Sequence, residues 1–279
     1  MTGTIGKARR LSRLINPADE RSLSLAFDHG LQLGRVPGMA NPAAMIAAAV
    51  EYEFDGMILT PGLVERYGDL LSGRHAPVTI MRVDQTTMWR VGSPLGYPAG
   101  HTRRVLSVED AIALGADAVI TYLFAAHQEP ELESRSLEIA ADVAESCRRY
   151  GIVHVIEPMA ARGGLAADPA DPEAIALPVR IAAELGADVI KADWSGDKKS
   201  FAKIVETALT PVVVAGGPRE GDDKSTLAFA SEVLKSGATG LLFGRQIFQA
   251  KDPTGLMQAL KRVVHGGEAP AQVKASLAS

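Results

Sequence analysis

Short apolar runs recur along the chain, and each ends in polar residues or in glycine and proline. They cover residues 23–30, 56–62, 78–84, 118–124, 153–159, 188–194, 211–217 and 240–245. Stretches rich in alanine and leucine with helical spacing lie between most of them, at 41–52, 133–150, 172–185 and 222–236. Continuous apolar strands that alternate with helices are typical of a parallel sheet covered on its faces, so we predict an α/β protein with eight strands.

Three segments repeat one plan, in which a helix end is followed by glycine, a small residue and a strand. They are "LGADAVITY" (114–122), "LGADVIKAD" (185–193) and "SGATGLLFG" (236–244). Glycine accepts the left-handed conformation that ends a helix. Eight such units in about 250 residues predict a (β/α)8 TIM barrel in a single domain. An open doubly wound sheet is the alternative, but no G-x-G-x-x-G fingerprint follows the first strand.

Three segments fall outside the repeating units. Within a barrel domain that spans residues 1–279, we expect residues 1–20 to form a segment that caps the bottom of the barrel. We expect residues 266–279 to form a C-terminal tail or an arm between subunits. Residues 85–107, between the third and fourth strands, carry glycine, proline and aromatic residues. A connection of that length in a compact barrel is usually functional or mobile.

Composition and charge narrow the classes of function. The chain has 279 residues, 47% of them hydrophobic, and a net charge of −4 without a basic stripe, so no nucleic-acid partner is expected. No apolar run approaches the ~20 residues that span a bilayer, and the N-terminus lacks a signal-peptide core. The single cysteine, Cys147, cannot form a disulfide within the chain. We therefore expect a cytoplasmic enzyme with no membrane partner.

Polar residues gather at the ends of the predicted strands. The active sites of TIM barrels lie at the carboxyl ends of their strands. In chain order the candidates are Asp28, His29, Arg82, Asp84, Tyr122, Glu157, Lys191, Asp193, Gly216, Gly217, Gly244 and Arg245. One polar residue at a strand end is common, but the convergence of so many on one face predicts a site.

Lys191 stands in the middle of an apolar strand, where an unpaired ammonium ion would be costly. Strand alternation places it on the same side as Val189 and Asp193. If that side faces the barrel axis, low-dielectric surroundings favour an uncharged amine, which can attack a carbonyl and form a Schiff base. The iminium then draws electrons from a neighbouring carbon–carbon bond that is being cleaved or formed. The structural alternative is a fixed ion pair with Asp193 or Glu157.

Glycine turns follow the last two strands. Gly216 and Gly217 come after the seventh strand, and Gly244 and Arg245 come after the eighth. Barrels often bind phosphate here through backbone N–H groups, and an arginine adds a charged fork. We therefore predict a phosphate site, with His29 as a further substrate contact. The alternative is that the glycines only make tight turns.

Asp28 and Glu157 are expected to project near the lysine. Carbinolamine formation, its dehydration and the carbon–carbon step all need proton transfer, which a carboxylate or a tyrosine such as Tyr122 can supply. The alternative for Asp28 is a turn at the strand end. The alternative for Glu157 is a salt bridge to Lys191 or Arg162.

We expect neither a metal nor another cofactor. The six histidines and one cysteine show no H-x-H, H-E-x-x-H or C-x-x-C spacing. His154 and Glu157 are three residues apart on a predicted strand and therefore face opposite sides. Trp89 and Trp194 flank the predicted mouth, either as walls of a pocket or as packing residues.

Several of these segments together resemble the archaeal-type class I fructose-bisphosphate aldolase family. The resemblance rests on "GKARRLSRLINP", "LSLAFDHG", "GADVIKADWSGD", "PVVVAGG" and "GATGLLFGRQIFQ", and covers about residues 6–250. It implies a (β/α)8 barrel with Lys191 as the Schiff-base lysine and Asp28 as an acid/base or hydroxyl ligand. It also implies phosphate binding at the two glycine turns. Members of the family are commonly homo-oligomers, often decamers of two stacked rings of five.

The sequence departs from this family after the fifth strand. Members that cleave fructose bisphosphate have a tyrosine in a Tyr-Pro-Arg-Gly context, whereas "IEPMAARGG" places Met159 at the aligned position. The Glu157-Pro158 pair resembles class I tagatose-bisphosphate and sulfofructose-phosphate aldolases, so Glu157 is expected to take over proton transfer together with Tyr122. A second lysine on the seventh strand, as in deoxyribose-phosphate aldolase, is missing, which disfavours that activity.

The resemblance therefore predicts a lyase, a class I aldolase that acts on a phosphorylated ketose or a related sugar phosphate. The wider group also includes a synthase of an aminodideoxyheptulosonate and the thiolase that degrades phosphorylated autoinducer-2. A coenzyme A-dependent thiolase that acts on a phosphorylated diketone is thus the alternative activity. A barrel without catalysis, with Lys191 locked in a salt bridge, is the third hypothesis.

Overall fold

Eight strands form one closed parallel barrel in the computed structural model, which describes residues 3–277. Around the barrel their order is β1, β10, β9, β8, β7, β6, β3 and β2. The strands are β1 Ser22–Ala26, β2 Gly56–Leu59, β3 Val78–Arg82, β6 Ala118–Ala125, β7 Val153–Ala160, β8 Val189–Ala192, β9 Val212–Ala215 and β10 Gly240–Phe243. Each predicted apolar run overlaps one of them, so the predicted single-domain (β/α)8 TIM barrel is confirmed.

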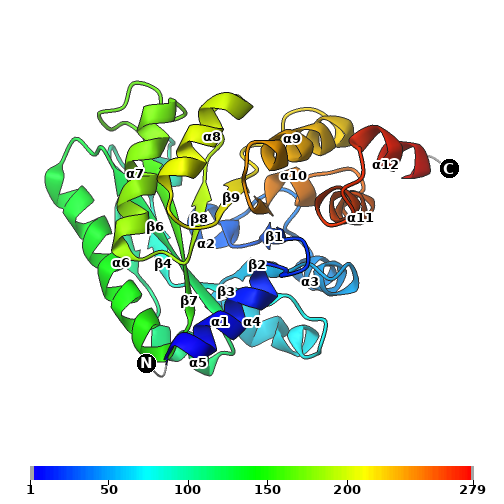
Figure 1. Cartoon of the computed structure of the whole chain (residues 1–279). Helices are drawn as coiled ribbons and strands as arrows, with labels where there is room; N and C mark the ends of the chain where they lie inside the picture. Colours follow the sequence, from blue (N-terminus) through cyan, green and yellow to red (C-terminus); the bar gives the residue numbers. More distant parts are fainter. Residues whose placement is uncertain (1–2, 278–279) are drawn as a thin grey trace.

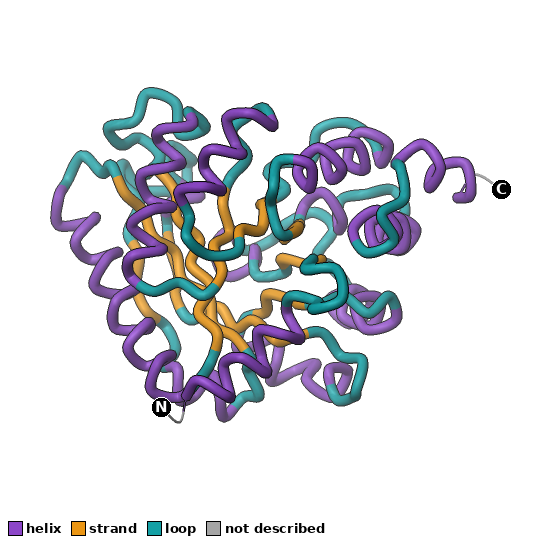
Figure 2. The backbone as a smooth tube through the Cα atoms, viewed as in Figure 1, coloured by secondary structure: helices purple, strands orange, loops and turns teal. Residues whose placement is uncertain are grey.

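Helices surround the strands (Figure 2). They are α1 Gly3–Leu14, α2 His29–Leu33, α3 Pro42–Glu51, α4 Pro61–Tyr67, α5 Val108–Ala113, α6 Pro130–Tyr150, α7 Pro172–Leu185, α8 Lys198–Thr207, α9 Asp223–Lys235, α10 Arg245–Phe248, α11 Pro253–Val264 and α12 Pro270–Leu277, with 3₁₀ turns η1 Gly68–Leu71 and η2 Met88–Arg90. Asn41, Asp171 and Asp252 cap helices whose first residue is proline. Within the described residues, no helix combines the length and the apolar character needed to cross a membrane.

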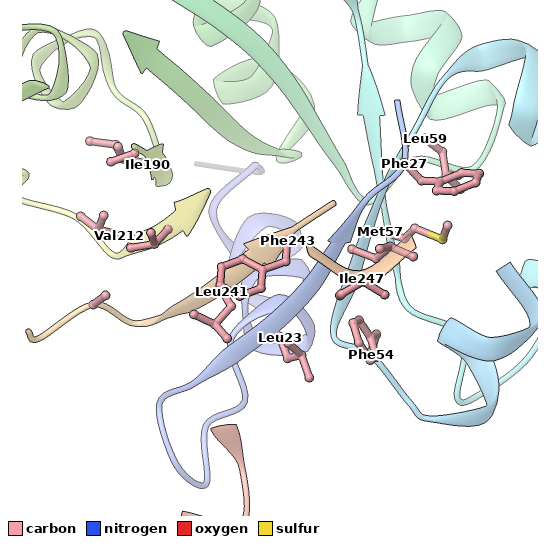
Figure 3. Close-up of a cluster of buried hydrophobic side chains, with 14 of the residues drawn as sticks. Leu23, Phe27, Phe54, Met57, Leu59, Ile190, Val212, Leu241, Phe243 and Ile247 are labelled. Atoms are coloured by element: carbon pink, nitrogen blue, oxygen red, sulfur yellow. The ribbon is translucent and has the colours of Figure 1, made fainter. Parts of the chain in front are cut away.

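The strand side chains alternate between two apolar layers. The outer layer, between strands and helices, includes Ile190 on β8 and Phe243 on β10 (Figure 3). A smaller cluster fills the inside of the barrel and includes Val155 and Val189. Because alternate residues of a strand face opposite sides, Lys191 shares the inward face of β8 with Val189.

The amino end of the barrel is covered by α1 (Figure 1). Leu14, its last residue, belongs to the inner cluster, and Leu11 packs against that cluster. A Cβ atom at Gly56, the first residue of β2, would lie 2.7 Å from the Leu14 side chain, so Leu14 packs directly against the start of β2. Side chains from the N-terminal segment thus complete the core from below.

The C-terminal segment contains helix α12, which packs beside α11 and α9. Its Val273 is fully buried in the outer apolar layer. The last two residues of the segment predicted as a tail, 278 and 279, lie outside the described residues. The described part of that segment therefore contributes to the core of its own chain.

The long connection after β3 forms an antiparallel hairpin. Its strands are β4, Asp84–Thr86, and β5, Thr102–Arg104, and η2 lies between them. Met88 in η2 is fully buried, and Thr86 anchors the hairpin through bonds to the backbone of His101 and Met88. The hairpin thereby holds Trp89 at a defined position beside the barrel mouth.

Candidate active site

A cavity of about 930 Å³ opens at the carboxyl ends of the barrel strands. Its wall includes all nine residues predicted for catalysis or substrate binding: Asp28, His29, Tyr122, Glu157, Lys191, Gly216, Gly217, Gly244 and Arg245. They come from the ends of six different strands, so the barrel closure brings together residues that are far apart in the sequence. The volume is within the range of small-molecule sites in proteins.

Lys191 and Glu157 meet on the wall of this cavity. The Lys191 side chain is 8% exposed, and its Nζ donates a hydrogen bond of 2.5 Å to Glu157 Oε1. The two residues lie on the adjacent strands β8 and β7. The ion pair considered as the structural alternative is therefore present. A carboxylate at this distance is also the group best placed to accept the proton of the ammonium ion.

Arg82, the last residue of β3, is the centre of a buried network. Its Nε donates to Asp28 Oδ2 at 2.7 Å and its Nη2 donates to Glu157 Oε2 at 2.5 Å. Its Nη1 donates to Asp84 Oδ1 at 3.2 Å, and the guanidinium carbon lies 3.8 Å from the centre of the Tyr122 ring. One guanidinium with no exposed surface therefore contacts three carboxylates and an aromatic face.

The protonation states within this network differ. Burial raises the pKa of Asp28, but the charges of Arg82 and Lys191 and the hydrogen bond from Arg82 outweigh it and hold that pKa below its usual value. Burial raises the pKa of Asp84 to about 7, against the opposing charge of Arg82. Asp28 therefore remains a carboxylate at neutral pH, whereas Asp84 is close to its titration midpoint.

Tyr122 carries a neutral hydroxyl. Burial raises the pKa of Tyr122 well above the usual value, so the phenol keeps its proton at neutral pH. The hydroxyl oxygen accepts a hydrogen bond of 3.1 Å from Trp89 Nε1. Tyr122 is also in register with Glu157 on the neighbouring strand β7. The tyrosine can therefore donate its own proton to a hydrogen bond inside the cavity.

The glycine turns after β9 and β10 are held side by side. Gln246 Nε2 donates to the carbonyl oxygens of Gly216 and Pro218, at 2.8 and 2.9 Å. A Cβ atom at Gly216 would lie 2.8 Å from Gln246 Cγ, and one at Gly244 would lie 2.5 Å from His29 Cε1. Glycine is therefore required at both positions because neighbouring side chains occupy the space that a Cβ would need.

Two side-chain nitrogen atoms beside these turns have no hydrogen-bond partner within the described part of the chain. Arg245 Nε and His29 Nδ1 are buried and have no hydrogen-bond partner among the described residues. Burial lowers the pKa of Arg245, and the charge of Arg162 adds to this effect. Burial lowers the pKa of His29 to about 4, against the opposing charge of Asp28, so the imidazole is neutral. Both residues line the cavity.

The outer mouth carries aromatic and charged residues. The guanidinium carbon of Arg162 lies 4.6 Å from the centre of the Trp89 ring, and both residues line the cavity. Asp193 lines it as well. Burial raises the pKa of Asp193, and the charge of Glu157 adds to this effect while Lys191, Arg162 and Arg245 oppose it. The mouth therefore combines a hydrophobic wall with groups of both charges.

Other predicted candidates have local partners. His154 is fully buried, and its Nε2 is 2.9 Å from Thr121 Oγ1. Trp194 lines the cavity but also packs on Phe201 and Phe229. Across residues 3–277, no group of three or more histidine, cysteine, aspartate or glutamate side chains is arranged to hold a metal ion.

Arg82 stands at the end of a predicted strand, but the sequence alone assigns it no role in the site. The available signal was the same as for Lys191, because "VTIMRVD" places a charged residue inside an apolar run. The sequence predicts Arg162 only as a salt-bridge partner of Glu157, and Trp89 as a wall of the pocket or a packing residue. Their contact depends on the hairpin after β3 meeting the turn after β7, which no local pattern reveals.

Comparison with known families identifies this architecture. The family model described as "DeoC/LacD family aldolase" matches residues 22–250. The chain belongs to the DeoC/LacD family of aldolases. The matched residues include all eight barrel strands and all nine predicted site residues.

Named relatives cover nearly the whole chain. An uncharacterized aldolase of Saccharolobus solfataricus is 30% identical, with 94% of this chain and 95% of the relative covered. The 2-amino-3,7-dideoxy-D-threo-hept-6-ulosonate synthase of Halobacterium salinarum is 32% identical, over 95% of this chain and 94% of the relative. The class 1 fructose-bisphosphate aldolase of Thermoproteus tenax is 30% identical, over 89% and 91%.

Solved structures agree with these relatives. An archaeal fructose 1,6-bisphosphate aldolase superposes with a TM-score of 0.81 at 28% identity, covering 94% of this chain and all of that one. A second has its catalytic lysine covalently bound to the carbinolamine intermediate, with a TM-score of 0.81 and 27% identity over 93% of this chain and all of that one. The predictions of a class I, Schiff-base aldolase and of a lyase are confirmed by these similarities. These relatives are aldolases and synthases rather than thiolases, so they give the coenzyme A-dependent alternative no support.

Proposed function

We propose that Lys191 forms the Schiff base, and that the substrate is a phosphorylated ketose or a related sugar phosphate. The observation that carries this proposal is the contact of 2.5 Å between Lys191 Nζ and Glu157 Oε1 on the wall of the cavity. The named activities of the relatives, a fructose-bisphosphate aldolase and two synthases of amino-sugar acids, support the substrate class.

The proposed chemistry begins with one proton transfer. Glu157 takes a proton from the Lys191 ammonium, and the free amine adds to the ketone carbon to give a carbinolamine. The protonated Glu157 then returns its proton to the carbinolamine hydroxyl, which leaves as water while the carbon–nitrogen double bond forms. The products are a cationic iminium, water and the Glu157 carboxylate, so atoms and charge balance. The bond between the carbon next to the iminium carbon and the following hydroxyl-bearing carbon can then break. Its electron pair forms the double bond of a neutral enamine, and the hydroxyl group loses its proton to a base and becomes the carbonyl group of the released aldehyde.

The departure from the family at the fifth strand fits this assignment. Met159, which the alignment places at the position of the family tyrosine, lines the cavity but has no transferable proton. Glu157 supplies one instead. Tyr122, with its neutral hydroxyl, donates a hydrogen bond to an oxygen of the substrate. Asp28, held as a carboxylate, accepts the proton of a substrate hydroxyl or binds that hydroxyl.

The phosphate of the substrate is proposed to lie at the glycine turns. Gly216, Gly217 and Gly244 allow backbone N–H groups to approach an anion closely. Arg245 supplies a charge, and its Nε is without a partner in the described structure. His29, neutral and packed on Gly244, supplies a further hydrogen bond. A phosphate here lies on the strands that follow β8 around the barrel, and so on one side of Lys191.

A trapping experiment tests this function directly. The protein is incubated with dihydroxyacetone phosphate or fructose 1,6-bisphosphate and reduced with borohydride, and the modified peptide is found by mass spectrometry. We expect a single covalent adduct on Lys191 and no adduct when ketose is omitted. An adduct on another lysine, or none with any phosphorylated ketose, contradicts the proposal.

We also propose a homo-oligomer in the cytoplasm that takes part in carbohydrate metabolism, with the decamer of the family as the specific expectation. Exposed apolar side chains such as Leu177 and Leu209 offer surface for contacts between subunits. Light scattering of the purified protein measures the assembly, and a mass of one chain contradicts it.

A further inference from the structure

Arg82, the centre of the buried charge network, has no assigned task in the proposed chemistry. Its neighbours Asp28, Tyr122 and Glu157 line the cavity, whereas Arg82 is not among the cavity-lining residues. Its side chain has no exposed surface. Arg82 therefore cannot be reached by the substrate through this cavity, and any effect on catalysis has to act through the side chains that it contacts.

The position of β3 lets one side chain reach both halves of the site. In the barrel β3 lies between β2 and β6, with β1 two strands away on one side and β7 two strands away on the other. From there Arg82 bonds Asp28, just after β1, and Glu157 on β7. The guanidinium is planar and presents its donors in a fixed fork, so it sets the relative orientation of the carboxylates that it holds.

Arg82 also leaves one specific oxygen of Glu157 for the lysine. Glu157 Oε2 accepts from Arg82 Nη2 and Glu157 Oε1 accepts from Lys191 Nζ, each at 2.5 Å. Without the arginine, the carboxylate could turn both oxygens toward the ammonium ion and form a closed ion pair. We infer that Arg82 is a positioning residue, which orients Glu157 so that its Oε1 exchanges a proton with Lys191.

The charge of Arg82 has a second consequence for this exchange. Burial by itself lowers the pKa of Arg82, but Tyr122 and the three carboxylates around it more than reverse this, so the guanidinium stays charged. When Glu157 holds the proton taken from Lys191, the adjacent permanent cation favours giving that proton up again. The carbinolamine hydroxyl is then protonated and leaves as water. Arg82 thus favours the return of the proton, and it takes up none itself.

The inference rests on the proposed function, and a kinetic comparison tests both separately. The rate of borohydride trapping is measured against dihydroxyacetone phosphate concentration for the wild type, Arg82→Lys, Glu157→Gln and the double variant. Lysine keeps the charge but lacks the planar fork. We expect Arg82→Lys to lower the maximal trapping rate about 100-fold, with the half-saturating concentration changed by less than about threefold.

The double variant separates positioning from a general structural role. Once Glu157 is a glutamine, there is no carboxylate left to orient. The maximal trapping rate of the double variant should therefore be less than about tenfold below that of Glu157→Gln alone. Full additivity of the two losses overturns the inference. Arg21→Lys is the matched control, because Arg21 also bonds an internal acceptor, the carbonyl oxygen of Ala238, but at the amino end of the barrel. An equal loss in this control also overturns the inference.

A second variant keeps the test decisive if Arg82→Lys does not fold, as judged by circular dichroism. Glu157→Asp keeps the carboxylate but shortens it by one methylene, so it cannot reach both Arg82 and Lys191. We expect its trapping rate to be within about tenfold of that of Glu157→Gln. A wild-type rate in Glu157→Asp contradicts the inference. Failure of the wild type itself to form an adduct contradicts the proposed function instead.

Discussion

The two ends of the barrel both carry ion pairs, but of different kinds. Strand β8 shows the contrast within four residues. Just before it, Asp188 pairs with Lys7 of α1 at 2.9 Å, and both side chains are partly exposed. Near its other end, Lys191 pairs with Glu157 at 2.5 Å, and both are almost completely buried. The same type of ion pair therefore occurs at two places along one strand, once in contact with solvent and once buried in the protein.

Because their environments differ, the two ion pairs have different roles. Exposed ion pairs contribute about 0–1 kcal/mol to stability and tie elements together, as Lys7 ties α1 to the base of β8. Burying a pair costs free energy that well-packed apolar residues would not cost. The buried charge network beside the cavity therefore contributes little to the stability of the fold. Its groups are instead placed where they can take part in a reaction. Burial therefore distinguishes the two roles, whereas residue type does not.

The largest expected effect separates the two lysines. Lys191→Met should abolish adduct formation and lower aldol cleavage of fructose 1,6-bisphosphate at least about 10³-fold, because no other amine is proposed to attack the ketone. Lys7→Met, the matched control at the amino end, should keep the trapping rate within about twofold. Mass spectrometry and a coupled cleavage assay measure both. Equal losses in the two variants would remove the distinction between the ends.

A smaller effect is expected at the glycine turns. Arg245→Met should raise the half-saturating concentration of dihydroxyacetone phosphate in trapping by about 10–100-fold. A loss of this size corresponds to one or two charged hydrogen bonds to the phosphate. Unphosphorylated dihydroxyacetone is the internal control, because it has no group for Arg245 to bind. Its half-saturating concentration should not change. Parallel changes for both ketones would assign Arg245 to packing rather than to phosphate.

The smallest effect concerns stability at the amino end. His265 Nδ1 lies 2.7 Å from Asp19 Oδ2, and its Nε2 lies 3.0 Å from Asp55 Oδ2. Burial lowers the pKa of His265, but hydrogen bonds and charges of Asp55 and Asp19 outweigh it, so the folded-state pKa is raised. A raised pKa means that the stabilisation is complete below the unfolded value of about 6.5 and is lost as the pH rises through the folded value.

His265→Gln should therefore lower the melting temperature by about 2–4 °C at pH 6 and by less at pH 9, measured by thermal denaturation. His75→Gln is the matched control, since His75 lies 2.9 Å from Glu53 but is 67% exposed. Its melting temperature should follow the wild type at both pH values. A larger loss for His265→Gln at pH 9 than at pH 6 would reverse the assigned sign.

Several features of the fold followed from local pattern alone. Each apolar run became a barrel strand because a strand covered on both faces has to be apolar along its whole length. Lys191 was identified because an ammonium ion is costly inside such a run. The hairpin after β3 was missed, since its strands, Asp84–Thr86 and Thr102–Arg104, are short and mostly polar. They are paired through the tertiary position of the loop rather than by an apolar pattern.

The sequence by itself determined the barrel, the inward-facing lysine and the strand ends at which polar residues gather, because these depend on periodicity within a few residues. Only the tertiary structure decided which of those residues touch. Closing the barrel places Arg82 between Asp28 and Glu157, which are 54 and 75 positions away from it in the chain. Contacts of that separation depend on strand order and on the tilt of strands around the barrel, and no local pattern encodes either.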